Sequence, residues 1–273
     1  MKIRTVREAG PYEKEITKMK KLALILAIVM VIGMLSGCGG NDAKSDKLVV
    51  ATSPDFPPFE NLENGEVVGI EIDLLNIICE KMGKELVIEQ MNFDSVLPGV
   101  QAGKFDLGAS GISVTPEREK NVLFTDPYCL AAQAIVVMAD SPITCKADLE
   151  GKTVSVQTGT TAESFCMDNG YTVNSFEANS DAQTALTTGK VDAWVIDDLT
   201  AADMVAVYNE SNPGALVILD EAMTTEPYAF AFSMKSEALV AEINAILVEL
   251  VKDGTVAEIF ANNNAPYTQP ELG

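Results

Sequence analysis

Short apolar segments alternate with segments of helical periodicity along most of the chain, and this alternation restricts the fold to the α/β class. With 273 residues, the chain is long enough for one large domain or two ordinary ones. The expected strands are residues 48–51, 86–88, 105–109, 134–138, 153–157, 173–176, 191–196 and 216–219, and the expected helices are residues 74–82, 96–102, 180–188, 237–251 and 256–260.

The segment 105–118 is typical of a buried strand that turns directly into a helix. Thr115 is a good N-cap, and Pro116 stands at the first helical position, where proline is favoured. Arg118 is unexpected at the third position, because the first turn already carries a partial positive charge and N–H donors that prefer an anion. A bound carboxylate would satisfy the guanidinium and these donors, with Ser113 and Thr115 adding hydroxyls. The alternative is an ion pair between Arg118 and a neighbouring acidic side chain.

Two later segments have similar features. Residues 153–161 repeat the order of strand, glycine turn and helix start, which predicts a second set of free N–H groups that can bind an anion. An ordinary capped helix is the alternative, and no Lys follows the glycine as a nucleotide-binding loop requires. Asp197 ends an apolar strand, at the carboxyl end where open α/β sheets place their ligands. Either Asp197 or Asp198 can instead cap the helix that follows.

The charge distribution excludes several classes of function. The formal net charge is −21, and the first 37 residues hold seven Lys and Arg but three Asp and Glu, so the remainder carries 12 − 37 = −25. Such an acidic surface repels nucleic acid and anionic headgroups, so we expect no nucleic-acid partner. The chain contains no His, which excludes histidine-based catalysis and histidine metal ligands. We expect neither a metal nor a cofactor.

The N-terminal part has the features of a lipoprotein signal. Lysines precede the apolar run 22–35, which is too short to span a membrane, and small residues precede Cys38 as at a lipoprotein cleavage site. Cys38 would become the lipidated N-terminus, and a short uncleaved anchor is the alternative. The first 18 residues are unlike the start of a signal, so we expect residues 1–37 to be an upstream segment and signal peptide, with translation starting at Met19. Residues 38–46 would form a flexible, lipidated tether.

Three segments of the chain carry a family resemblance: Gly103-Lys104-Phe105-Asp106, Ser113-Val114-Thr115-Pro116-Glu117-Arg118 and Phe124-Thr125-Asp126-Pro127-Tyr128. They resemble the amino-acid-binding members of the bacterial extracellular solute-binding proteins that serve ABC importers. The resemblance implies a two-lobed periplasmic-binding-protein-like fold, with two crossover segments and a central ligand cleft. It places lobe 1 at residues 47–130 and 226–273 and lobe 2 at residues 131–225.

The resemblance also implies roles for single residues around a free amino acid. Arg118 and the N–H groups of Ser113 and Thr161 would bind the ligand carboxylate. Asp197, the Gly111 carbonyl and the Ser113 hydroxyl would bind the ligand ammonium. The expected partners are therefore a free amino acid and the permease subunits of an ABC transporter, with a lipid anchor to the outer face of the membrane. We expect the protein to be a monomer.

Aromatic residues in two loops match the family positions that enclose the ligand side chain. Phe56 and Phe93 would face each other across that side chain. The alternatives are that Phe56 plugs the core and that Phe93 is a hydrophobic staple for its helix, while Phe59 is expected in the core. Relatives that bind lysine, arginine or histidine often carry an acidic residue where this chain has Ser53, so the resemblance implies a neutral ligand side chain. Asp55 weakens this expectation, because its carboxylate can pair with a cation.

Two other classes of function share the fold. A cyclohexadienyl-dehydratase-like enzyme would need a carboxylic acid in the cleft to protonate a leaving hydroxyl, and Asp55, Glu60 and Asp198 are the candidates. A ligand-sensing domain of a receptor kinase is disfavoured, because no spanning helix or signalling domain follows in this sequence. We expect a binding protein and not an enzyme.

The cysteines that remain after Cys38 do not have the spacing of zinc ligands. Cys79 lies on the apolar face of a helix and is expected to be a buried thiol. A bridge between Cys145 and Cys166 is an open alternative for an exported protein.

Overall fold

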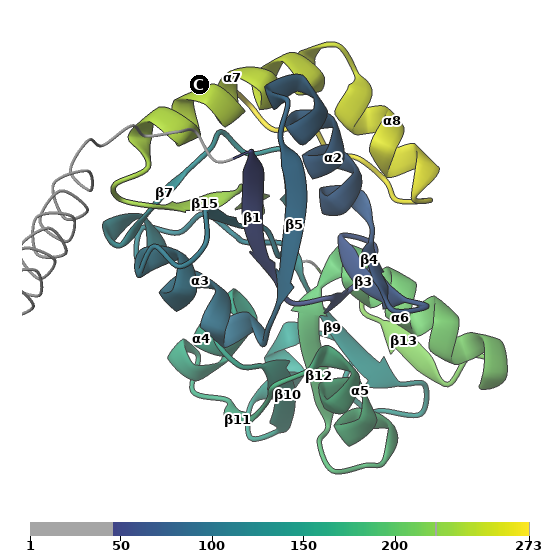
Figure 1. Cartoon of the computed structure of the whole chain (residues 1–273). Helices are drawn as coiled ribbons and strands as arrows, with labels where there is room; N and C mark the ends of the chain where they lie inside the picture. Colours follow the sequence, from purple (N-terminus) through teal and green to yellow (C-terminus); the bar gives the residue numbers. More distant parts are fainter. Residues whose placement is uncertain (1–45, 222, 273) are drawn as a thin grey trace, which may run out of the picture. The chain divides into compact units, whose positions relative to one another are not determined.

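The computed structural model describes residues 46–221 and 223–272, which form two five-stranded sheets with helices around them (Figure 1). The expectations for the signal peptide, the start at Met19, Cys38 and nearly all of the tether concern residues outside this range. Within the described part, no helix combines the length and the apolar character that a membrane span needs.

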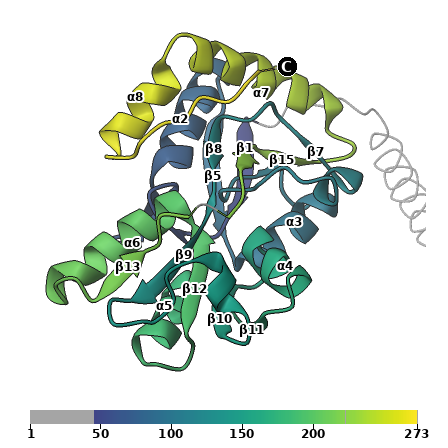
Figure 2. The same cartoon turned by 180° about the vertical axis from the view of Figure 1, so that it is seen from behind.

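The first sheet has the strand order β5-β1-β6-β15-β7. Strand β1 is parallel to β5 and β6, and β15 is antiparallel to β6 and β7. Because β15 and two helices come from the last part of the chain, the chain returns to this sheet after it has built the second (Figure 2). The elements are β1 (Lys47–Thr52), α2 (Ile70–Met82), β5 (Glu85–Gln90), α3 (Phe93–Gln101), β6 (Leu107–Gly108), β7 (Val122–Phe124), β15 (Ala231–Ser233), α7 (Glu237–Lys252) and α8 (Thr255–Asn262).

The second sheet has the strand order β11-β10-β12-β9-β13. Strand β10 is parallel to both of its neighbours, whereas β9 is antiparallel to β12 and β13. The elements are β9 (Gln133–Met138), the 3-10 helix η2 (Lys146–Leu149), β10 (Thr153–Gln157), α4 (Thr161–Asp168), β11 (Thr172–Phe176), α5 (Asn179–Thr187), β12 (Ala193–Asp197), α6 (Asp198–Ser211) and β13 (Leu216–Ile218).

Two crossover segments connect the sheets and pair with each other. Strand β8 (Cys129–Ala131) runs antiparallel to β14 (Glu226–Tyr228) in a two-stranded sheet. The rings of Tyr128 and Tyr228 lie beside this pair, with centroids 6.5 Å apart, and both side chains are fully buried. The crossovers are therefore hydrogen-bonded to each other in the core of the protein. The remaining strands form a small antiparallel sheet: β2 (Asp55–Phe56), β3 (Glu60–Glu63) and β4 (Glu66–Val68).

The two-lobed α/β fold expected from the sequence is confirmed, and most elements lie within a few residues of their expected positions. Helix α2 buries Leu74, Leu75 and Ile78, as its helical spacing predicts. The segment 105–118 is different from the expectation. Its strand β6 has two residues, and its helix is a single 3-10 turn, η1 (Arg118–Lys120).

The physical reason is pairing with the second crossover. Ser113 forms a β-bridge with Tyr228, and the Val114 N–H donates to the Pro227 carbonyl over 2.8 Å, so the backbone is held extended up to this point. The chain then re-enters the first sheet at β7, which leaves room for one turn only.

All four cysteines of the described part are free thiols. The Cys145–Cys166 bridge is therefore absent, while Cys79 is buried on α2 as expected.

Candidate functional site

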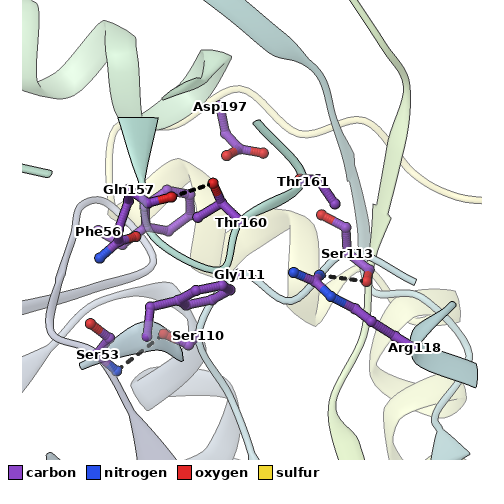
Figure 3. A pocket seen from close by; sticks show the side chains of 11 residues that line it. Ser53, Phe56, Ser110, Gly111, Ser113, Arg118, Gln157, Thr160, Thr161 and Asp197 are labelled. Carbon is purple, nitrogen blue, oxygen red and sulfur yellow. Dashed lines mark hydrogen bonds between the residues drawn. The ribbon is translucent and has the colours of Figure 1, made fainter. Parts of the chain in front are cut away.

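One pocket is lined by residues at the ends of strands from both sheets (Figure 3). It holds about 290 Å³ of empty space, part of it open to solvent. Every ligand-contacting residue expected from the sequence is in the lining set. The lining residues are Ser53, Phe56, Phe93, Ser110, Gly111, Ser113, Arg118, Gln157, Thr160, Thr161 and Asp197.

Arg118 reaches the pocket from the single turn η1. The Thr115 hydroxyl accepts the Arg118 N–H over 3.2 Å, so the expected cap bond is present although the helix is short. The guanidinium donates to the carbonyls of Ser113 at 2.9 Å and Gly159 at 3.3 Å. Arg118 takes part in no ion pair of the described residues, and Glu117 pairs with Lys120 instead. The alternative of a local ion pair to Arg118 is therefore wrong, and its charge faces the pocket.

Asp197 is the last residue of β12 and is the acidic side chain among the described residues that line the pocket. Its Oδ1 accepts hydrogen bonds from Gln133 Nε2 at 2.9 Å and from the Tyr228 hydroxyl. Burial raises the pKa of Asp197 to about 8, and the nearby charge of Glu226 adds to this. The capping role expected for Asp198 is not observed, because Asp197 is the N-cap residue of α6, without a side-chain cap bond, and Asp198 is the first helical residue. The Asp198 Oδ1 instead accepts the N–H groups of Ala132 at 3.2 Å and Leu199 at 2.9 Å.

The second glycine turn brings the start of α4 to the pocket. Thr160 is the N-cap, and its hydroxyl accepts the Glu163 N–H over 3.1 Å. The N–H of Thr161 is one of the first-turn donors that have no acceptor within the helix. Gly159 has a φ of 81°, and a Cβ there would lie 3.1 Å from the Asp94 Cα, so a larger residue would push the two segments apart.

Two aromatic side chains form walls of the pocket. Phe56 packs on Gly111, where a Cβ would lie 2.4 Å from a ring carbon of Phe56, and Gly111 has a φ of 53°. Phe93 begins α3, and the Arg118 guanidinium carbon lies 5.8 Å from its ring centroid. Phe93 also packs with Val96 of the same helix, so it is part of the core as well as of the pocket. Phe59 is fully buried away from the pocket, as expected.

Residues 48–263 match the description "Bacterial extracellular solute-binding proteins, family 3". The chain belongs to this family. The match covers both sheets and both crossovers, so the pocket lies within the part that the family shares.

Relatives in family 3 include proteins that bind arginine. The arginine-binding extracellular protein ArtP of Bacillus subtilis (strain 168) is 32% identical over 251 residues, which cover 88% of this chain and 96% of ArtP. A solved structure of an ancestral arginine-binding protein bound to glutamine is 38% identical, with a TM-score of 0.73, and the match covers 80% of this chain and 97% of that one. The ancestral amino-acid-binding protein AncCDT-1, a precursor of cyclohexadienyl dehydratase, is 32% identical, with a TM-score of 0.73 and coverage of 80% and 95%.

The sequence analysis missed several polar residues at this family 3 pocket. Gln157 ends β10 as Asp197 ends β12, so the rule that ligands bind at the carboxyl ends of strands already pointed to it. Glu226 lies behind the pocket, and its Oε2 accepts the hydroxyls of Ser113 and of Thr161, the latter over 2.7 Å. No local pattern marks Glu226, because its partners lie far away in the sequence. Glu226 thus connects the two segments that contain Ser113 and Thr161.

Asp55 is turned away from the pocket and toward the second sheet. Its Oδ2 accepts the Asn179 N–H at 2.7 Å, in the first turn of α5, and its Oδ1 accepts from Gln157 Nε2 at 3.3 Å. Ala178, the N-cap of α5, has no capping side chain, so Asp55 supplies the missing acceptor from another part of the chain. Burial raises the pKa of Asp55.

Proposed function

We propose that this chain is the extracytoplasmic substrate-binding lipoprotein of an ABC importer, which captures one free amino acid and delivers it to the membrane permease. The observation that carries the proposal is the placement of a basic and an acidic side chain around one pocket: Arg118 comes from η1, and Asp197 from the end of β12 in the second sheet (Figure 3). An α-amino acid is a zwitterion whose carboxylate and ammonium match these two groups.

The proposed contacts use the donors and acceptors that surround the pocket. Arg118 and the N–H groups of Ser113 and Thr161 bind the carboxylate, and Asp197, the Gly111 carbonyl and the Ser113 hydroxyl bind the ammonium. Charged hydrogen bonds contribute about 1.5–3 kcal/mol each, and association costs at least about 4 kcal/mol. This balance supports a dissociation constant near or below the micromolar range.

We propose that two lobes close on the ligand by rotation about the crossovers. Lobe 1 is residues 47–130 and 226–273, and lobe 2 is residues 131–225. Several hydrogen bonds cross this division, among them those from the Asn179 N–H to Asp55, from Arg118 to the Gly159 carbonyl, and from Asn92 Nδ2 to Glu177 Oε2 over 3.0 Å. The closed complex would be the form that the permease subunits recognise, with the protein as a monomer.

We propose a neutral side chain for the ligand. Asp197, which is assigned to the ammonium, is the one acidic residue in the lining that the structure describes. Apart from Asp197, Arg118 and Gly111, the lining groups are hydroxyls, the Gln157 amide and the Phe56 and Phe93 rings. The second candidate is a basic amino acid, which the arginine-binding relatives favour. In that case Asp55 would have to leave the Asn179 N–H to reach the ligand.

A thermal-unfolding series with ligand-stripped protein separates the two candidates. At a hundredfold excess of ligand over its dissociation constant, linkage adds about 2.7 kcal/mol, which is several degrees of Tm for a chain of this size. We expect glutamine or another neutral amino acid to give the largest shift. If arginine or lysine gives it and neutral amino acids give none, the neutral assignment fails. Asp55→Asn then becomes the diagnostic variant, because it should remove the shift by arginine.

None of the three acids considered for the dehydratase alternative lines this pocket. Asp55 and Asp198 accept backbone N–H groups, and Glu60 is fully buried behind Ser110. We therefore propose a binding protein and not an enzyme. Loss of prephenate, followed optically in the presence of the protein, would contradict this.

We propose that Cys38 carries the lipid and that Met19 is the working start. Two or more acyl chains are enough for stable anchoring to the outer membrane face. Labelled palmitate should be incorporated by the natural protein and not by Cys38→Ala, whereas Cys79→Ala should retain the label. Equal incorporation in all three would exclude lipidation at Cys38. Detection of a peptide from residues 1–18 in cells would exclude the start at Met19.

A further inference from the structure

Two glutamates lie side by side beneath the pocket, without any exposure to solvent. Glu60 is the first residue of β3, and Glu71 lies in the first turn of α2, and both have 0% relative exposure. The backbone brings them together, because the N–H of Glu71 donates to the Phe59 carbonyl over 3.0 Å. Burying one ionised carboxylate is unfavourable, and burying two in contact is more so. The pair therefore requires an explanation.

The hydrogen bonds of the pair show which carboxyl group is ionised. Glu71 Oε2 accepts the Gly111 N–H at 3.2 Å, and Glu71 Oε1 accepts the Tyr128 hydroxyl, as an ionised carboxylate would. Glu60 Oε1 accepts the Ser110 hydroxyl at 2.8 Å. No donor among the described residues reaches the buried Glu60 Oε2. The two carboxyl groups lie close together, because they bond the successive residues Ser110 and Gly111. A proton on Glu60 Oε2 would let this oxygen donate to the Glu71 carboxylate and would give the buried atom a partner.

Each member of the pair holds a residue of the pocket wall. The Ser110 hydroxyl that donates to Glu60 also accepts the Ser53 N–H over 3.1 Å (Figure 3). Glu71 holds the peptide N–H of Gly111, whose carbonyl is assigned to the ligand ammonium. Through Tyr128, Glu71 is also tied to the start of the first crossover. Three lining residues, Ser53, Ser110 and Gly111, thus depend on the pair.

We propose that Glu60 and Glu71 share one proton, which Glu60 carries and donates to the Glu71 carboxylate, and that this pair positions Ser110 and Gly111 for the ligand. The positioning role rests on the proposed function, whereas the shared proton does not. Glu60 and Glu71 are positioning residues, because neither lines the pocket. The other titratable groups that face the pair are Asp55 of β2 and, at the first crossover, Tyr128 and Cys129.

Electrostatics supports this assignment of the proton. Burial, followed by the charge of Glu71, raises the pKa of Glu60 well above its usual value. Burial also raises the pKa of Glu71, but the bonds from Glu60, Tyr128 and Gly111 oppose that shift. The pKa of Glu60 is higher in the folded chain than in the unfolded chain, so protonated Glu60 stabilises the fold. This stabilisation is complete below the unfolded-state pKa and is lost as pH rises through the folded-state pKa. The ligand-free protein should therefore lose stability toward alkaline pH.

Glu60→Gln is the decisive variant. The amide keeps an oxygen for Ser110 and places an N–H donor toward Glu71, so it imitates the protonated acid but does not titrate. We expect affinity for the best amino acid to stay within about threefold of the natural protein, since the hydrogen bonds are retained. We also expect a smaller loss of Tm of the ligand-free chain between neutral and alkaline pH. Glu63→Gln, on the exposed end of β3, is the control and should behave as the natural protein does.

Glu71→Gln should weaken amino-acid binding, in contrast to Glu60→Gln. One amide oxygen would replace the two carboxylate oxygens that accept from Gly111 and Tyr128, so we expect affinity to fall about tenfold or more.

If Glu60→Gln and the natural protein lose Tm equally at alkaline pH, the shared proton is excluded. If that variant does not fold, infrared spectra of the natural protein decide: a buried protonated carboxyl band at neutral pH supports the proposal, and its absence overturns it. If no amino acid binds the natural protein, the proposed function fails while the Tm and infrared results still test the proton.

Discussion

Replacing Arg118 with alanine should weaken amino-acid binding by more than about a hundredfold, because two charge-assisted bonds at about 1.5–3 kcal/mol each would be lost. Arg118→Lys should recover only part of this, since a point charge cannot make two parallel bonds to a carboxylate. Isothermal titration calorimetry with the amino acid that gives the largest thermal shift measures both. The fold should persist, because the Arg118 guanidinium bonds two carbonyls near the surface and no buried carboxylate.

Lys120→Ala is the matched control for Arg118. Lys120 belongs to the same turn, and its ammonium pairs with Glu117 at the surface. Such exposed pairs contribute about 0–1 kcal/mol, so removal of this positive charge should leave affinity nearly unchanged. Equal affinity for Arg118→Ala and the natural protein would remove Arg118 from the site. Equal losses in Arg118→Ala and Lys120→Ala would instead show a general electrostatic effect of the turn.

The parts of the site that were predictable from the sequence carry local signals. Asp197 closes an apolar strand, and Thr161 opens a helix after a glycine turn, so both positions follow from the rules for strand ends and helix starts. Arg118 was conspicuous because a cation is unfavourable at the start of a helix. Arg118 lines the pocket although the helix is one 3-10 turn that begins at Arg118, and the Thr115 hydroxyl accepts its N–H.

The remaining features depend on partners that are far apart in the sequence. Ser113 and Glu226 are 113 residues apart, and Asp55 and Asn179 are 124 apart. Hydrophobic periodicity carries no information about such polar pairs, because it reports only which face of an element is buried. The short β6 has the same origin. Local apolarity predicted a longer strand, but the chain beyond β6 pairs at Ser113 with Tyr228 of the second crossover, which is far away in the sequence.

Asp197→Asn should weaken binding by about tenfold or more, since a charged hydrogen bond to the ligand ammonium would become a neutral one. The same variant tests a proton effect. Burial raises the pKa of Asp197 from 3.8 to about 8 in the ligand-free protein. Protonated Asp197 therefore contributes to the free energy of unfolding. This contribution is complete below pH 3.8 and is lost as pH rises through about 8.

Ligand binding should reverse this shift, because an ammonium beside Asp197 favours the ionised carboxylate. Binding between about pH 6 and pH 8 should then release a proton, and affinity should rise with pH over this range. Titrations in buffers of different ionisation enthalpy measure the number of protons released. Asp197→Asn should release none from this position. Asp198→Asn is the control, since Asp198 lies outside the pocket and its Oδ1 can still accept the Ala132 N–H as an amide. Proton release that persists in Asp197→Asn would show that another group titrates and that Asp197 does not receive the ammonium.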